Sequence, residues 1–226
     1  SLPRTIVWGA AWDATRDAET SPREFIQLVL NNISAETEST TILTLLRQLI
    51  TTGNLYVAEA HREEFLVAIG DGLLDLARKV AAGSDLQLQL LKFFPQFART
   101  DEQLDALEAI LDGKEKISGL EIDADLKWEL LTGLVVAGRK GEAEIAAALE
   151  ADNTANGQRA AAGARAAIPT AAAKAKAWSE LVDGSDMSNA LVQAASLGFV
   201  RVIDPALLTP YVDQYFEQAL HIWKKN

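Results

Sequence analysis

The chain has 226 residues, of which 49% are hydrophobic and none is cysteine, and its formal net charge is −11. This composition allows a sizeable core and argues against long disordered tracts. The acidic balance argues against nucleic acid and against anionic membrane surfaces as partners, since both attract basic proteins. Without cysteine there is no disulfide, thiolate metal ligand or cysteine nucleophile, which suits a reducing compartment such as the cytoplasm.

The N-terminal segment shows no targeting signal. Residues 1–17 lack the charged region, apolar region and cleavage site of a signal peptide. No apolar run in the chain reaches the roughly 18 residues that a membrane span requires, so we expect no membrane partner and a cytoplasmic location. The segment enters an amphipathic helix at once without a starting Met. We interpret this as a fragment of a longer protein, although removal of a Met before Ser1 would leave the same start.

Helical patterns fill the first half of the chain. We expect helices over 3–18, from Pro22, over 37–52 and over 57–82, with two more opening at capping boxes, Ser84 with Gln87 and Thr100 with Gln103. Ser21 and Glu24 form a capping box, and apolar residues repeat at helix spacing in the third helix, at Ile42, Leu45, Leu46 and Leu49. Gly53-Asn54 is expected to end that helix. Gly70-Asp71-Gly72 is a potential break in the next one, and Pro95 should kink or end the helix that contains it.

The second half becomes rich in alanine. Residues 113–123 read as a loop, after which Asp123 opens a helix that Gly138 ends. Eleven of the twenty residues 158–177 are Ala, which has the highest helix propensity and lets helix axes approach closely. We expect four tightly packed helices, over 140–151, 154–167, 170–182 and 187–197. A last helix starts at Thr209-Pro210.

No stretch alternates apolar and polar residues long enough to predict a sheet, and no linker rich in Pro, Gly or Ser interrupts the chain. The fold class is therefore predicted as all-α, with residues 1–226 in a single all-helical repeat domain. The helix pairs show no strict sequence period. This favours the looser HEAT-like class of α-solenoid, whose stacked pairs form a curved bowl.

The sequence offers little chemistry of its own. Its two histidines, His61 and His221, are too far apart in the chain for a His-Glu-x-x-His zinc helix. The segment 61–64 (HREE) is interpreted as a solvated helix face. A Gly-x-Ser-x-Gly elbow and a phosphate-binding glycine loop are both absent from the sequence, and helix starts and surface charge account for most of the paired carboxylates. We predict no catalytic, cofactor-binding or metal-binding residue.

One cluster near the N-terminus has two interpretations. Trp8 and Trp12 lie four residues apart and share a helix face, which Asp13, Arg16 and Asp17 flank. Arg16 can pair with Asp13 one turn back. The cluster is either packed and paired within the chain or in contact with another domain. Trp12, Asp13, Arg16 and Asp17 are therefore candidates for an interdomain contact.

Several segments together resemble a known family. They are VWGAAWDATRD at 7–17, the stretches 25–30 and 45–48, DLKWELL at 125–131 with Gly138-Arg139, KAKAW at 174–178 and LTPYVDQYF at 208–216. In this order they resemble the C-terminal domain of the zinc-dependent aminopeptidase N family, and the alanine-rich, acidic character is similar to that of the bacterial, especially the actinobacterial, members.

The resemblance implies a non-catalytic role. In that family the C-terminal domain is a helical, HEAT-like bowl that covers the zinc-bearing catalytic domain and restricts which peptides reach the metal. The Gly-x-Met-Glu-Asn strand, the zinc helix and the transition-state tyrosine lie upstream of it, and none of these motifs occurs in this sequence. The resemblance thus implies zinc in a missing catalytic domain, with that domain and peptide substrates as partners. Two alternatives stay open, which are a free-standing helical-repeat scaffold for protein partners and an enzyme that uses scattered carboxylates.

Overall fold

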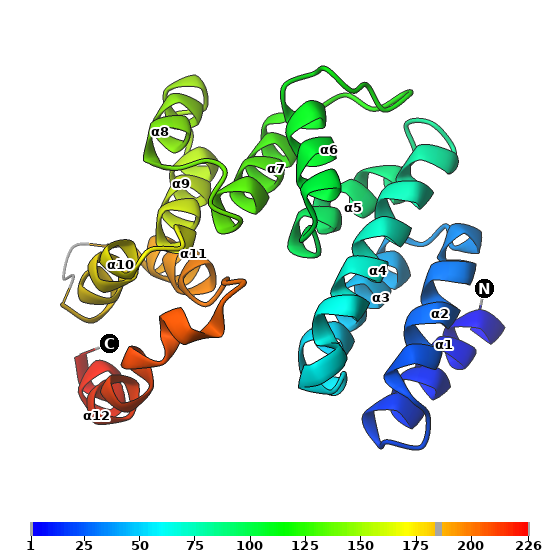
Figure 1. Cartoon of the computed structure of the whole chain (residues 1–226), viewed down its shortest axis with the longest axis horizontal. Helices are drawn as coiled ribbons and strands as arrows, with labels where there is room; N and C mark the ends of the chain where they lie inside the picture. Colours follow the sequence, from blue (N-terminus) through cyan, green and yellow to red (C-terminus); the bar gives the residue numbers. More distant parts are fainter. Residues whose placement is uncertain (1, 184–186, 226) are drawn as a thin grey trace. The chain divides into compact units, whose positions relative to one another are not determined.

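The computed structural model describes residues 2–183 and 187–225, and every regular element in these ranges is helical (Figure 1). This confirms the all-α prediction. The α-helices are α1 (Leu2–Arg16), α2 (Pro22–Asn32), α3 (Ser39–Thr51), α4 (Glu59–Lys79), α5 (Asp85–Phe93), α6 (Asp101–Leu111), α7 (Ala124–Val136), α8 (Glu142–Ala151), α9 (Ala155–Ala167), α10 (Ala171–Asp183), α11 (Asn189–Phe199) and α12 (Pro210–Lys225). Short helical turns are η1 (Ile33–Ala35), η2 (Thr52–Tyr56), η3 (Phe94–Gln96) and η4 (Pro205–Leu208).

Local capping chemistry sets several helix ends. The Ser21 hydroxyl accepts a hydrogen bond from the Glu24 amide, and the Glu24 carboxylate accepts one from the Ser21 amide, which completes the predicted capping box of α2. The Asp123 carboxylate accepts from the Leu126 amide at the start of α7. Gly113 and Gly138 follow α6 and α7 with φ of 71° and 74°, a left-handed conformation that favours glycine.

The two glycine-based predictions have different outcomes. The third α-helix ends at Thr51, one residue before the predicted end, but the backbone continues through Gly53-Asn54 as the π-helical turn η2 to Tyr56. A Cβ at Gly53 would lie 2.9 Å from Leu66 Cδ2, so this glycine allows close packing. The potential break at Gly70-Asp71-Gly72 is absent, because α4 runs through all three residues. A Cβ at Gly70 would lie 2.8 Å from Gln103 Nε2 and 3.1 Å from the Phe97 carbonyl oxygen, so glycine at this position allows close packing.

Smaller differences concern α5. The predicted cap Ser84 does accept a hydrogen bond from the Gln87 amide. The predicted capping box is not completed, however, because Gln87 Oε1 accepts from the Gly83 amide instead of the Ser84 amide, and its Nε2 donates to the Ala77 carbonyl of α4. Gln87 therefore ties α5 to the preceding helix. Pro95 acts as predicted, since α5 ends at Phe93 and η3 follows.

The chain divides into two compact units, unit 1 over residues 1–122 and unit 2 over residues 123–226. The core of unit 1 is lined by apolar side chains of α2 to α6, including Phe25, Val29, Ile42, Leu45, Leu46, Leu49, Ile69, Leu73, Leu90, Phe94 and Leu107. The stripe predicted for the third helix is thus buried as expected. A single domain over 1–226 and a curved bowl of HEAT-like pairs stay predictions.

Unit 2 is organised around α9, which contacts α7, α8, α10 and α11. Its contact with α11 is very close at two glycines. A Cβ at Gly198 would lie 2.7 Å from the carbonyl carbon of Gly163 and closer still to its oxygen. Small residues therefore let these two helix backbones touch, as expected for the alanine-rich segment.

Candidate functional site

The predicted interdomain cluster lies on α1, whose inner face packs within unit 1. Trp8 is buried, and its Nε1 donates a hydrogen bond to Glu36 Oε1 at 2.9 Å. Arg4 Nε lies 2.9 Å from the same oxygen, so the buried Glu36 carboxylate is paired with a cation and an indole N–H. These contacts fix α1 to the segment that follows α2.

Trp12 also faces inward. Its ring stacks on Tyr56 with centroids 5.7 Å apart and an interplanar angle of 28°, and it lies tilted against Phe25 at 5.4 Å. Offset aromatic pairs at these distances are favourable in packed interiors. The geometry matches the first of the two interpretations for this residue, in which Trp12 is packed within the chain.

The three charged members of the cluster point away from that core. Asp13, Arg16 and Asp17 are exposed, and Arg16 lies 3.3 Å from a carboxylate oxygen of each aspartate. The hydrogen bond that Arg16 Nε donates to the Asp17 carboxylate, together with the negative charges of both aspartates, raises the pKa of Arg16 above its ordinary value. The structure thus separates the predicted set into an inward tryptophan and an outward charged group. Its interdomain role stays a prediction.

The outer face of α1 also carries exposed apolar side chains, which the sequence analysis missed. Ile6 and Val7 are 62% and 59% exposed. Ile6 lies about half a turn from Trp8 on the helix, so it points away from the tryptophan face. The available signal was that α1 has apolar residues on two sides, which a helix with one buried stripe does not need.

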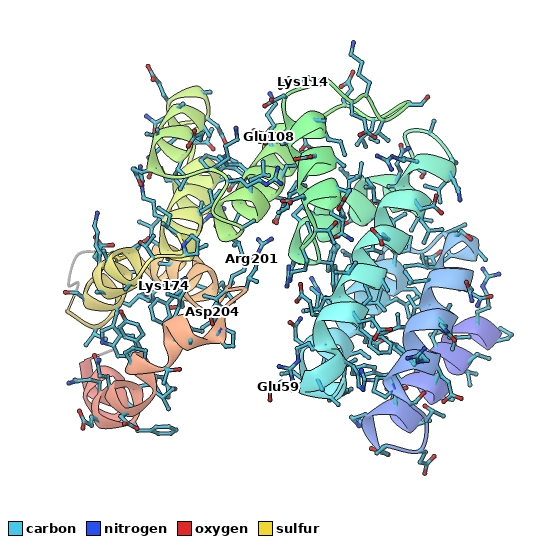
Figure 2. The ribbon with its side chains drawn as sticks, in the orientation of Figure 1. Glu59, Glu108, Lys114, Lys174, Arg201 and Asp204 are labelled. Carbon is cyan, nitrogen blue, oxygen red and sulfur yellow. The ribbon has the colours of Figure 1, made fainter. Side chains whose placement is uncertain are left out.

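A second group of interest is a buried lysine in unit 2. Lys174 lies on α10 (Figure 2) and is fully buried. Its Nζ donates hydrogen bonds to the Ala166 carbonyl at 2.7 Å and to the Phe199 carbonyl at 2.8 Å. These carbonyls belong to the last turns of α9 and α11. Because helix C-termini carry partial negative charge, one ammonium group satisfies two helix ends at once.

The surroundings of Lys174 are aromatic. Its Nζ lies 5.4 Å from the centroid of the Phe199 ring, and Phe199, Trp178 and Tyr211 form a triangle with centroids 5.1 to 5.8 Å apart. Burial lowers the pKa of Lys174 to about 8, while the two carbonyls and the ring face favour the ammonium. The amine is covered and hydrogen-bonded, so its arrangement suits helix positioning and not attack on a substrate.

A concavity of about 510 Å³ lies in unit 1, where the segment after α2 faces the end of α4 and the start of α5. Glu36 lines it together with Ser34, Thr37, Leu76 and Ser84. The Glu36 carboxylate is already held by Trp8 and Arg4, and no predicted site residue lines the concavity.

The comparisons with known proteins agree on one family. A family model described as the ERAP1-like C-terminal domain matches residues 1–226. The chain belongs to this family. Aminopeptidase N of Streptomyces lividans is 43% identical to the chain over 223 residues. The match covers 99% of the chain but only 26% of that relative, so the chain spans about a quarter of its length.

These findings confirm the resemblance to the C-terminal domain of bacterial aminopeptidase N. Within residues 2–183 and 187–225, no group of three or more His, Cys, Asp or Glu side chains is arranged to hold a metal ion. His61 is exposed, with Nδ1 3.9 Å from a carboxylate oxygen of Glu64. The side chain of His221 lies outside the described part.

The same ranges of the ERAP1-like domain contain no helix that is long and apolar enough to cross a membrane. The longest helix among them, α4, has 21 residues and carries charged side chains along its length.

Proposed function

We propose that this ERAP1-like domain is the non-catalytic C-terminal part of a zinc-dependent aminopeptidase, in which it covers the catalytic chamber and restricts which peptides reach the metal. The observation that carries the proposal is the match along the whole chain. It combines the family assignment with 43% identity to an aminopeptidase N of which the chain covers a quarter. This match favours the interpretation of the chain as part of a peptidase over that of a free-standing scaffold.

The chemistry of the described residues supports a division of labour. Catalytic zinc in hydrolases is held by three protein ligands, most often His with Glu or Asp, plus a water. The described side chains offer no such set. The proposal therefore assigns the zinc and the cleavage of the N-terminal residue to the rest of the parent protein, which is cytoplasmic in this account.

A packed helical wall suits control of access. Such a wall excludes folded proteins but leaves room for extended peptides, and a rigid rotation of the wall changes how wide the entrance is. The net charge of −11 attracts the positive N-terminus of a peptide, and this attraction weakens with added salt. The partners in this account are the catalytic part of the same polypeptide and its peptide substrates.

The zinc content and the aminopeptidase activity of the purified 226-residue chain test the division of labour. We expect no bound zinc and no release of a chromophore from an aminoacyl anilide, whereas the full parent protein should show both. Stoichiometric zinc together with activity in the chain alone would overturn the proposal.

The parent reading frame separates this proposal from the scaffold alternative. Several hundred codons ahead of Ser1 that include a His-Glu-x-x-His motif support the peptidase. A frame that opens at Ser1 supports the scaffold.

A further inference from the structure

The outer face of α1 has two distinct halves. The half nearer the N-terminus is apolar, because Ile6 and Val7 are more than half exposed and the small residues Gly9 and Ala10 are exposed beside them. A Cβ built at Gly9 would meet nothing within 4 Å, so none of the described residues packs on the helix at this position. The half nearer the C-terminus carries the charged group of Asp13, Arg16 and Asp17.

This face differs from the exposed face of the helix that follows. On α2 the exposed positions are polar or charged, at Arg23, Glu24, Gln27, Asn31 and Asn32. A helix at the end of an array normally has a polar outer face of this kind, because its apolar residues would otherwise meet water. The apolar half of α1 is therefore atypical of a free end and typical of a covered face.

We propose that the outer face of α1 is the docking surface for an amphipathic helix from the part of the parent polypeptide that precedes Ser1. This inference rests on the proposed function, since it needs a parent protein. The relative with 43% identity is about four times as long as the matched segment, so most of such a protein lies outside residues 1–226.

The chemistry of the face defines its occupant. Aliphatic side chains of the docking helix pack on Ile6 and Val7, and Gly9 and Ala10 allow the two helix axes to approach closely. At the other end, the trio of Asp13, Arg16 and Asp17 has a net charge of −1, which favours a lysine or arginine on the partner. Trp12 takes part only indirectly, by holding α1 on unit 1 through Tyr56 and Phe25.

A second copy of the chain fits this face less well. A two-fold axis perpendicular to the helices makes two paired α1 helices antiparallel, so the apolar half around Ile6 would meet the charged half around Asp13 and Asp17, which leaves apolar side chains against ionised groups. A two-fold axis parallel to the helices would instead place the two negatively charged halves against each other.

The absence of cysteine from the sequence allows a clean test by thiol labelling. Ile6→Cys reports on the proposed surface, with Val7→Cys as a second reporter, and Gln27→Cys on the exposed face of α2 is the matched control. Each variant is made in the 226-residue chain and in the full parent protein, and folding is checked by circular dichroism. Signal from other cysteines of the parent is subtracted with the unsubstituted parent.

We expect Ile6→Cys and Gln27→Cys to react at similar rates in the 226-residue chain. In the parent, the reaction of Ile6→Cys should slow by about 100-fold while that of Gln27→Cys changes little, since a covered thiol reacts only when the contact opens. Equal rates for the two positions in the parent would overturn the docking surface. Slow labelling of Ile6→Cys in a chain that sediments as a dimer would assign the face to a second copy and overturn it too.

The zinc content and the aminopeptidase activity of the same parent samples are measured as well. They test the proposed function independently of the labelling, which tests the docking surface. A protected Ile6→Cys in a parent without zinc and activity removes the proposed function and keeps the docking helix. An active parent with an unprotected Ile6→Cys removes the docking helix and keeps the function.

Discussion

The contact between α9 and α11 makes Gly198→Ala a sharp test of the structure of unit 2. The added Cβ would lie 2.7 Å from the carbonyl carbon of Gly163 and 2.9 Å from its Cα, and closer still to the oxygen. Because these are backbone atoms, no change of rotamer relieves the clash. The two helices have to move apart by about 1 Å, against a close-packed surround.

The size of the effect follows from two opposing contributions. Overpacking of a core costs about 1–3 kcal/mol, and a clash between backbones belongs at the upper end. Alanine in place of glycine within a helix gains about 1 kcal/mol. We therefore expect Gly198→Ala to lower the free energy of unfolding by about 2 kcal/mol.

Two matched substitutions separate the clash from the helix propensity. In Gly163→Ala the new Cβ would lie 3.2 Å from the Ala194 carbonyl oxygen, a tight contact that small shifts relieve, so the change should be within about 1 kcal/mol of neutral. In Gly9→Ala the Cβ meets nothing within 4 Å, so the variant should be more stable by about 0.5–1 kcal/mol.

Urea unfolding followed by far-ultraviolet circular dichroism at pH 7 measures these differences. The predicted order of stability is Gly9→Ala, then Gly163→Ala, then Gly198→Ala. A Gly198→Ala variant as stable as Gly163→Ala would refute the backbone contact between α9 and α11.

Three further predictions concern buried and capping groups. The pKa of Lys174 in the folded chain is about 8, below the ordinary 10.5, so between these pH values the folded chain binds fewer protons than the unfolded chain. The free energy of unfolding of the unsubstituted chain, minus that of Lys174→Met, should therefore increase by up to about 3 kcal/mol as the pH rises through this window. A difference that stays constant or falls with pH in urea titrations would contradict the burial of Lys174. Thr100→Ala should destabilise the chain by about 1 kcal/mol through loss of the capping box with Gln103. Thr100→Ser keeps a capping hydroxyl and should therefore keep most of this stability. Trp8→Phe leaves the Glu36 carboxylate without its indole donor and should lower the midpoint of urea unfolding by the equivalent of about 1–3 kcal/mol, and an unchanged midpoint would speak against that buried hydrogen bond.

Local chemistry explains which parts of the fold could be predicted from the sequence. Ser21, Thr100 and Asp123 set helix starts through hydrogen bonds within four residues, so their roles are visible in the sequence. The structural roles of Gly53 and Gly70 depend on side chains from other helices. Sequence rules read both as breaks, whereas the structure uses them for close packing.

The same distinction applies to the candidate site. The pairing of Arg16 with Asp13 was predictable, because the two residues are one turn apart on one helix. The inward position of Trp12 depends on Tyr56, which is 44 residues further along the chain and enters the site through η2. The burial of Lys174 depends on the ends of α9 and α11, which only the tertiary structure brings together.

The central claim is that this domain works together with a separate catalytic part and limits the access of peptides to it. The most direct measurement titrates the 226-residue chain into the separately produced remainder of the parent protein. Binding and the hydrolysis of a short aminoacyl substrate and a long polypeptide are followed together. The account predicts saturable binding, with hydrolysis of the long substrate falling relative to that of the short one. No association at concentrations of about 100 μM, or binding that leaves the ratio of the two rates unchanged, would contradict it.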